Sequence, residues 1–570
     1  MLLQNKYIVH LLMLFGVIAL LSVVTVSSYT IAVGDMAYQK LYLGRVTIVF
    51  VICSLISLCL DKKGNTFYLS VVWSLIILGG VEAVWGLRQI YGLAVSNHSL
   101  YALTGSFYNP GPYSGYLAMV FPICLNEWLN LRKVKKRTWV EQGKYCMALG
   151  VLLLILCVLP AGMSRSAWMA VAISGIWVYA TYRSWGTSLR KIGRKYKKRV
   201  FPAIIAGGMV LIIVGYALFQ LKVDSANGRL LIWKVSVMAI VEKPLLGHGT
   251  GNFASAYGMA QEKYFSQKEF TSTEELVAGS PEYAFNEYLQ IAVEYGVLFL
   301  LVVLLIIVFC LWIGITEKRL SACAGLISVL VFAFSSYPMQ IPGFAIAFYF
   351  LLAACVVGSS RLQILFFIIM IALLGSYYWK YNQYNACEEW FRYKMHYNIG
   401  AFRLAKEGYE KIYPELNDRG AFLFEYGHSL HKLKEYNSST TILKEAMAHS
   451  CDPMILNIIG KNYQATGEYE KAEEYFIRST HRLPGRIYPY YLLAKLYAEP
   501  EYRHPEKLKQ AVQIVLTKLL QKSEMRKNMV MDLIYRGFIY AANYSESHYN
   551  PRRSQIKTEL RYLFVTTPNR

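Results

Sequence analysis

The sequence carries little charge for its length and lacks the short motifs of several common enzyme classes. Charged residues make up 17% of its 570 residues, against about 25% in an average soluble domain, whereas hydrophobic residues make up 55%. There is no Walker loop and no dinucleotide fingerprint, which argues against ATP-driven transport. No CxxC, HExxH or clustered His/Asp set points to a metal. The composition therefore indicates a membrane protein, and we expect no cofactor.

The cysteines give no sign of catalysis. Eight of the ten lie in apolar stretches, where cysteine behaves as a small hydrophobic residue. The other two, Cys387 and Cys451, lie in a polar C-terminal region, and the sequence leaves open whether they pair.

Long apolar stretches recur up to residue 378. Each is about 17–25 residues long, the length that crosses a bilayer core as a helix. The first lacks the small-residue cleavage site of a signal peptide, so we expect it to be retained. The sequence therefore predicts about eleven membrane helices, near residues 7–30, 42–60, 67–87, 112–128, 146–163, 167–181, 201–220, 288–313, 320–337, 343–359 and 362–378.

The net charge of +23 follows this pattern. Basic residues concentrate in the connections 128–145 and 181–200, and loops rich in Lys and Arg stay cytoplasmic. With a cytoplasmic N-terminus, the long loop 221–287 and the C-terminal region both face the periplasm. The charge is thus a topology signal and a contact with anionic lipids, not a sign of nucleic-acid binding. We expect a multi-pass protein of the bacterial inner membrane.

The C-terminal region, residues 379–570, has apolar residues at helical spacing and an internal offset of 33. Gly427 matches Gly460 and Tyr436 matches Tyr469 at this offset. A period near 34 with small residues at helix crossings resembles a tetratricopeptide repeat. The alternative is an unrelated helical domain with chance spacing. The predicted fold is all-α: a membrane helical bundle in residues 1–378, followed by a soluble α-solenoid that would bind a protein partner.

Unusual polar residues gather at the outward ends of the predicted membrane helices. Asn109, in SFYNPGPYSGYL, is best explained as a helix N-cap followed by Pro110. Glu82 lies near the outer end of the third apolar stretch. We treat Asn109 and Glu82 as secondary candidates for substrate binding.

Two arginines on the same side are the primary candidates. Arg165 lies in the tight turn MSRSAW, where an arginine either reaches lipid headgroups or meets an anion. Arg229, Trp233 and Val237 are spaced by four and share one face of a predicted amphipathic helix. Two guanidinium groups suit a diphosphate, because each planar fork binds phosphate oxygens in a bidentate manner. An apolar wall beside them would suit a lipid tail.

A glycine-rich turn and a polar stripe complete the candidate site. The turn GHGTGN contains His248 and presents backbone N–H groups that suit an oxyanion. His248 can equally be interpreted as a turn residue that makes only a local hydrogen bond. Glu287, Gln290 and Glu294 share one face of the next apolar helix. Because burying them against lipid is costly, we expect them to line a cavity.

Four segments in this order resemble the O-antigen ligase and polymerase family of bacterial membrane glycosyltransferases: FYNPGPYSGYL, SRSAW, GRLLIW followed by EKPLLGHGTGNF, and FNEYLQIAVEYG. The resemblance covers roughly residues 70–315. It implies a helical fold of the lipid-sugar transferase kind that takes a glycan from undecaprenyl diphosphate on the periplasmic face, without metal or nucleotide. The acceptor is a lipid A core sugar in ligases, another repeat unit in polymerases and a protein hydroxyl in oligosaccharyltransferases.

The resemblance also assigns roles to individual residues. Arg165 and Arg229 match the arginines that hold the carrier diphosphate, and Asn286 matches the asparagine of a His-Asn pair. Phe285 stands where many relatives have the histidine, so the usual group for activating the acceptor hydroxyl is missing.

Three explanations of this missing base stay open. Glu287 or His248 acts as a general base instead. Glu287 forms a structural ion pair with Arg229. Alternatively, no base is needed, because arginine-stabilised departure of the diphosphate provides most of the barrier reduction.

Two functions of other classes compete with glycan transfer. A lipid or polysaccharide transporter would place polar residues through several helices to the cytoplasmic side, whereas here they stay in the outward half. A membrane-tethered scaffold would explain the C-terminal region but not the clustered arginines.

Overall fold

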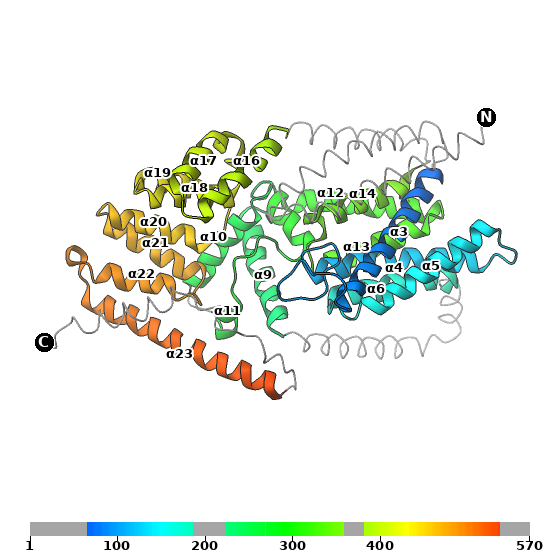
Figure 1. Cartoon of the computed structure of the whole chain (residues 1–570), viewed down its shortest axis with the longest axis horizontal. Coiled ribbons are helices and arrows are strands. Elements are labelled where there is room, and N and C mark those ends of the chain that lie inside the picture. Colours follow the sequence, from blue (N-terminus) through cyan, green and yellow to red (C-terminus); the bar gives the residue numbers. More distant parts are fainter. Residues whose placement is uncertain (1–64, 186–222, 268–269, 358–380, 536–570) are drawn as a thin grey trace.

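The computed structural model describes residues 65–185, 223–267, 270–357 and 381–535, and every regular element in these ranges is a helix. Figure 1 shows three groups of helices, with the middle group between the other two. We call the first group the apolar bundle. It contains α3 (Asn65–Ile90), α4 (Pro110–Arg132), α5 (Trp139–Val158), α6 (Arg165–Tyr182), α12 (Glu287–Thr316), α13 (Leu320–Ala333) and α14 (Pro342–Val356).

Helix α4 lies at the centre of the apolar bundle. It packs on α3, α5, α6 and α13, and Leu117 in its middle is fully buried. Glycines allow the close crossings: a Cβ on Gly115 would lie 2.2 Å from the Phe332 ring, and one on Gly79 would lie 2.5 Å from Val120. Small residues at crossings are how helices approach closely where lipid gives no hydrophobic drive.

Seven of the predicted membrane stretches correspond to helices of this bundle. Among the described residues, α3, α5 and α12 are long and apolar enough to cross a membrane, while α13 and the apolar part of α14 are shorter. The stretches predicted at 7–30, 42–60, 201–220 and 362–378 lie outside the described residues. The protein is therefore a membrane protein, and its full number of spans stays a prediction.

The predicted boundaries of two helices were wrong. The stretch 146–163 belongs to a helix that begins at Trp139, where Thr138 and Glu141 form a capping box, and ends at Val158. The stretch 320–337 ends as a helix at Ala333, because the chain turns there into a short loop. Hydropathy detects the apolar part of a helix but not the polar residues that cap its ends.

The long loop contains three helices, α9 (Val223–Glu242), α10 (Phe253–Ser266) and α11 (Ser272–Val277). Helix α9 ends at Glu242, just before Pro244. Val235 and Ala239 of α9 pack with Tyr257 of α10 and Val293 of α12, all fully buried. The loop is thus a packed unit seated on the N-terminal part of α12.

The third group forms the C-terminal region, whose successive helices pack in pairs. Gly427 and Gly460, matched at the offset of 33, face the second helix of their own pair: added Cβ atoms would lie 2.6 Å from Leu443 and 2.4 Å from Phe476. Cys387 and Cys451 are both buried, and no disulfide joins them. The helices are α16 (Tyr381–Asn398), α17 (Phe402–Leu416), α18 (Gly420–Lys432), α19 (Tyr436–Met447), α20 (Pro453–Ala465), α21 (Tyr469–Arg482), α22 (Tyr488–Tyr497) and α23 (Pro505–Tyr535).

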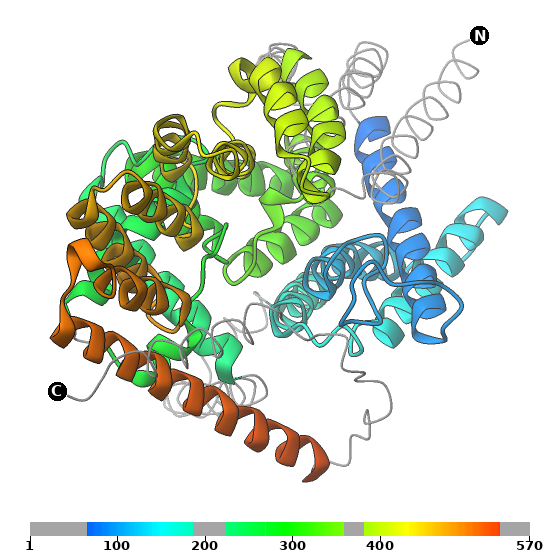
Figure 2. The ribbon, with the colours of Figure 1, turned by 60° about the vertical axis from the view of Figure 1, so that its left-hand side comes forward.

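The C-terminal helices dock on the long loop, which sequence analysis did not anticipate (Figure 2). Glu262 of α10 pairs with Arg478 at 2.7 Å and with Arg482 at 2.8 Å, and the Arg482 side chain is only 2% exposed. The Ser255 hydroxyl donates to the Met447 carbonyl at 2.8 Å. These contacts hold the C-terminal region against the helices that carry the candidate site.

Candidate functional site

Arg229 lies where four helices of the chain meet. It extends from α9 toward α6, where its Nη1 donates to the Ser166 hydroxyl at 3.4 Å. Ser166 is in turn 2.7 Å from the Ser335 hydroxyl, just after α13. The Arg229 guanidinium also lies 5.5 Å from the centre of the Phe285 ring, immediately before α12. No ion pair involves Arg229 among the residues that the structure describes.

Arg165 brings a second positive charge to the same place. It is the first residue of α6, directly before Ser166. Burial lowers the pKa of Arg229, and the nearby charge of Arg165 lowers it further. An arginine stays protonated in proteins, so the two groups remain as neighbouring like charges. The partial positive charge at the N-terminus of α6 adds to them. An anion bound between the arginines would relieve this repulsion.

An aromatic wall faces the arginines. Phe285 adopts φ 50°, a left-handed conformation that is rare outside glycine. Its ring meets Tyr337 edge-on at 5.1 Å, and Tyr337 stacks on Tyr283 at 5.2 Å. The Phe285 ring therefore lies beside Arg229, and it can neither accept nor donate a proton.

An apolar groove of about 430 Å³ adjoins Ser166 and Ser335. Because Ser166 accepts from Arg229 and is hydrogen-bonded to Ser335, the groove begins next to the guanidinium. Tyr288 also lines the groove, and its hydroxyl donates to the Leu330 carbonyl at 2.8 Å. The groove is lined by Ser166, Met169 and Ile173 of α6, Tyr288 of α12, Leu330 and Val331 of α13, and Phe334 and Ser335. This arrangement can hold an anionic headgroup and an apolar chain side by side.

The glycine-rich turn docks into a kink of α12. The kink lies at Gly296, with φ 84° and ψ 167°. There the Val293 carbonyl accepts from His248 N at 2.8 Å, and the Glu294 carbonyl accepts from Gly249 N at 2.9 Å. The Glu294 carboxylate also accepts from Gly251 N at 3.2 Å. The backbone N–H groups of the turn are thus used within the chain.

Two glycines of this turn form a matched pair for a test. Both have positive φ, 68° at Gly247 and 74° at Gly251, but a Cβ on Gly247 would lie 2.5 Å from the Glu294 backbone while one on Gly251 would meet nothing. Gly251→Ala should cost about 1–2 kcal/mol for the left-handed backbone. Gly247→Ala should lose the same stability and should also push the turn away from α12. Its melting temperature in detergent should therefore be clearly lower than that of Gly251→Ala. Equal melting temperatures for the two variants would show that the close approach is unimportant.

The polar stripe does not line an open cavity, contrary to the sequence prediction. Gln290 accepts from Ala284 N at 3.0 Å and donates to Glu294 at 3.1 Å. Glu287 is 4% exposed and accepts from Met339 N at 2.7 Å. The stripe instead holds three loops to the start of α12. Helical periodicity identifies a shared face but not the segment that covers it.

Asn286 and His248 have local partners. The Asn286 side chain caps α12 by accepting from Tyr288 N at 3.0 Å and Leu289 N at 3.1 Å. His248 Nε2 lies 2.8 Å from the Ala239 carbonyl, so this nitrogen carries the proton and donates. Ala239 is about 15 Å further along α9 than Arg229, at 1.5 Å per residue. The structure therefore does not bring His248 to the arginine pair.

The two secondary candidates also have structural roles. Asn109 caps α4 by accepting from Gly111 N at 3.0 Å, which confirms the simple interpretation. The buried Glu82 accepts from Ser106 N at 3.1 Å and from the Ser106 hydroxyl at 2.5 Å. It fastens the loop before α4 to α3.

Sequence analysis missed the segment between α13 and α14. This loop supplies Ser335, Tyr337 and Met339, which contact Ser166, Phe285 and Glu287 respectively. The signal was present as SSYPMQIPG, a polar break between two apolar stretches, but residues 335–337 were assigned to a membrane helix.

Residues 150–304 match the family model of the O-antigen ligases. The matched segment contains the two arginines, the glycine-rich turn and the start of α12, so this part of the chain is similar to membrane glycosyltransferases of the ligase type that act in polysaccharide assembly. It is a minority of the whole chain, and the C-terminal region lies outside it. No curated protein matches the chain at a significant level.

Proposed function

We propose that this protein transfers a glycan from an undecaprenyl-diphosphate carrier to an acceptor on the periplasmic face of the bacterial inner membrane. The arginine pair beside the apolar groove is the observation that carries the proposal. Arg165 and Arg229 would hold the diphosphate, and the groove between α6 and α13 would take the start of the polyprenyl tail. The match to the O-antigen ligase family over residues 150–304 supports the same reaction class.

The transfer is a displacement at the anomeric carbon of the carrier-linked sugar. The acceptor hydroxyl attacks this carbon with inversion, the bond to the diphosphate oxygen breaks, and the electron pair leaves with the undecaprenyl diphosphate. Positive charge aimed at the leaving oxygens stabilises the charge that develops in the transition state. The repulsion between Arg165 and Arg229 is relieved by that charge, so the pair favours the step that releases the diphosphate.

Activation of the acceptor hydroxyl needs no dedicated base in this proposal. His248 donates its Nε2 proton to Ala239 and lies toward the far end of α9. Glu287 is buried, and one of its carboxylate oxygens accepts from Met339 N. A general base must lie within hydrogen-bond reach of the proton that it removes, so we do not assign this role to Glu287. Glu287 would instead hold the α13–α14 loop in place, and the hydroxyl proton would pass to solvent or to the departing diphosphate.

The C-terminal region would act as a tetratricopeptide-type array that binds a protein. The equivalent positions of Gly427 and Gly460 against their partner helices support this repeat. Such a region suits a protein acceptor or a partner in an assembly complex, and this part of the proposal rests on analogy with repeat proteins.

Deletion of the gene followed by glycan analysis tests the function. We expect loss of a carrier-derived glycan from its final acceptor, restored by the full chain. Long chains stranded on the carrier would identify a ligase, single unpolymerised units a polymerase, and loss of protein-linked sugar an oligosaccharyltransferase. Carrier-linked glycan trapped on the cytoplasmic face would contradict the proposal and favour a transporter.

A further inference from the structure

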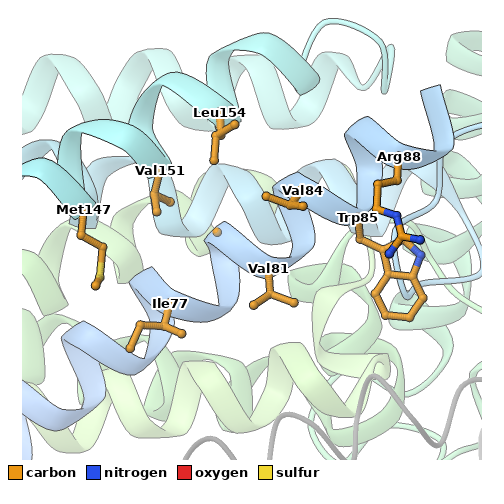
Figure 3. Close-up of a pocket in the computed structure, with 9 residues that line it drawn as sticks. Ile77, Val81, Val84, Trp85, Arg88, Met147, Val151 and Leu154 are labelled. Atoms are coloured by element: carbon orange, nitrogen blue, oxygen red, sulfur yellow. The ribbon is translucent and has the colours of Figure 1, made fainter. Parts of the chain in front are cut away.

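A second apolar groove, of about 470 Å³, runs between α3 and α5 on the surface of the apolar bundle (Figure 3). It is separate in lining residues from the groove beside the arginine pair. Its walls are almost entirely apolar, and a single charged side chain stands at one end. The groove is lined by Ile77, Gly80, Val81, Val84, Trp85 and Arg88 of α3 and by Met147, Val151 and Leu154 of α5.

A glycine makes room for the groove. At Gly80 a Cβ would already lie 3.0 Å from the Val151 side chain, so any larger residue there would fill the space between the helices. Val81 is 49% exposed and Val84 is 46% exposed. Such a surface on an apolar bundle is suited to contact with a hydrocarbon chain.

Arg88 and Trp85 lie together at one end of the groove (Figure 3). Arg88 is exposed in the last turn of α3, and no salt bridge to it occurs within the described part of the chain. Tryptophan and arginine are typical of the level where lipid headgroups begin. A positive side chain at the mouth of an apolar groove complements a lipid with an anionic headgroup.

The length of the groove corresponds to one leaflet. Ile77 and Arg88 are about 16 Å apart along α3 at 1.5 Å per residue, which is close to half of a hydrocarbon core of about 30 Å. Helices α3 and α5 run in the same direction along the groove, from Ile77 and Met147 toward Arg88 and Leu154 (Figure 3). Because α5 ends at Val158 and Arg165 begins α6 after a short turn, the Arg88 end of the groove lies at the same end of the bundle as Arg165.

We propose that the α3–α5 groove binds one anionic phospholipid of the leaflet on the Arg165 side. One acyl chain lies along Val81, Val84 and Val151, and the headgroup phosphate meets the guanidinium of Arg88. This site does not depend on the proposed glycan transfer, because its lining residues take no part in the arginine pair or its groove.

Lipid binding to the purified full chain, measured by native mass spectrometry, tests the proposal. The delipidated protein is titrated with phosphatidylglycerol or with phosphatidylcholine of the same acyl chains. We expect tighter binding of phosphatidylglycerol by about fivefold, the factor contributed by one guanidinium near an anionic headgroup. Arg88→Gln should remove this preference, whereas Arg183→Gln, at an exposed arginine at the other end of α6, should leave it unchanged.

A second pair of variants tests the groove itself. Val81→Trp should fill it and remove one bound lipid of either type, while Ile176→Trp, on a 61% exposed residue of α6 outside both grooves, should not. Both substitutions are at exposed positions, and equal melting temperatures would verify folding. Equal binding of the two lipids by the unaltered chain would overturn the proposal. So would unchanged lipid counts in Val81→Trp, which would mean that another segment of the chain fills the groove.

Discussion

Replacing Arg229 with alanine is expected to reduce glycan transfer by about a hundredfold or more while leaving the protein folded in the membrane. In the proposed function this guanidinium is one of two charges that would hold the diphosphate, and loss of one preorganised donor to a developing anion typically costs about 10²–10³ in rate. Arg229 is only partly buried, and its contacts are one hydrogen bond of 3.4 Å to Ser166 and the Phe285 ring, so the fold should survive their loss. The measurement is the rate of glycan transfer from a lipid-diphosphate donor by the purified protein.

Two comparison variants sharpen this prediction. Lys243→Ala removes an exposed positive charge from the same long loop and should leave the rate unchanged. Glu287→Gln should keep most activity, because a glutamine oxygen still accepts from Met339 N. If Glu287→Gln loses as much as Arg229→Ala, the carboxylate is the base after all. Full activity of Arg229→Ala would contradict the diphosphate site itself.

Replacing Glu262 with alanine is expected to release the C-terminal helices from the long loop. This carboxylate forms ion pairs with both Arg478 and Arg482, and the Arg482 side chain is 2% exposed. Removal of one partner from a buried ion pair leaves an uncompensated charge and typically costs about 3–5 kcal/mol. Amide hydrogens of α10 and α21 should therefore exchange much faster, which hydrogen-exchange measurements on the full chain check.

Glu242→Ala is the matched control for this variant. Its carboxylate pairs with Lys263 at 3.2 Å in the same long loop, but the lysine and glutamate side chains are 59% and 35% exposed. Exposed pairs contribute only about 0–1 kcal/mol, so hydrogen exchange should stay near that of the unaltered protein. Identical exchange in the two variants would mean that the docking depends on other contacts.

The sequence predicted local features well and the contacts between segments poorly. The seven apolar stretches within the described residues are helices, and Asn109 is the cap that its position before Pro110 suggests. The stripe from Glu287 to Glu294 lies on one face as predicted, but its side chains bond to the glycine-rich turn and the α13–α14 loop. A periodic pattern fixes which side chains share a face, whereas their neighbours depend on tertiary packing.

The site illustrates the same limit. The sequence singled out the two arginines because placing a guanidinium group near apolar membrane stretches costs free energy, so such residues are rare. Ser166, Ser335 and Tyr337 were missed because serine and tyrosine are common in membrane helices and gain meaning only from their neighbours. Phe285 lies beside Arg229 with a left-handed backbone conformation. Residue propensities do not predict this conformation for phenylalanine, so the contact could not be expected from the sequence.

The docking of α21 on α10 also sets an order of events during synthesis. Glu262 and Arg482 are separated by 220 residues. Ribosomes add about 5–20 residues per second, so α10 waits roughly 10–40 s for its partner after it has been made. Throughout this interval the Glu262 carboxylate has neither of its arginine partners, and a chain that stops before α21 never supplies them. The loop that carries Arg229 is therefore completed only after most of the C-terminal region has been translated.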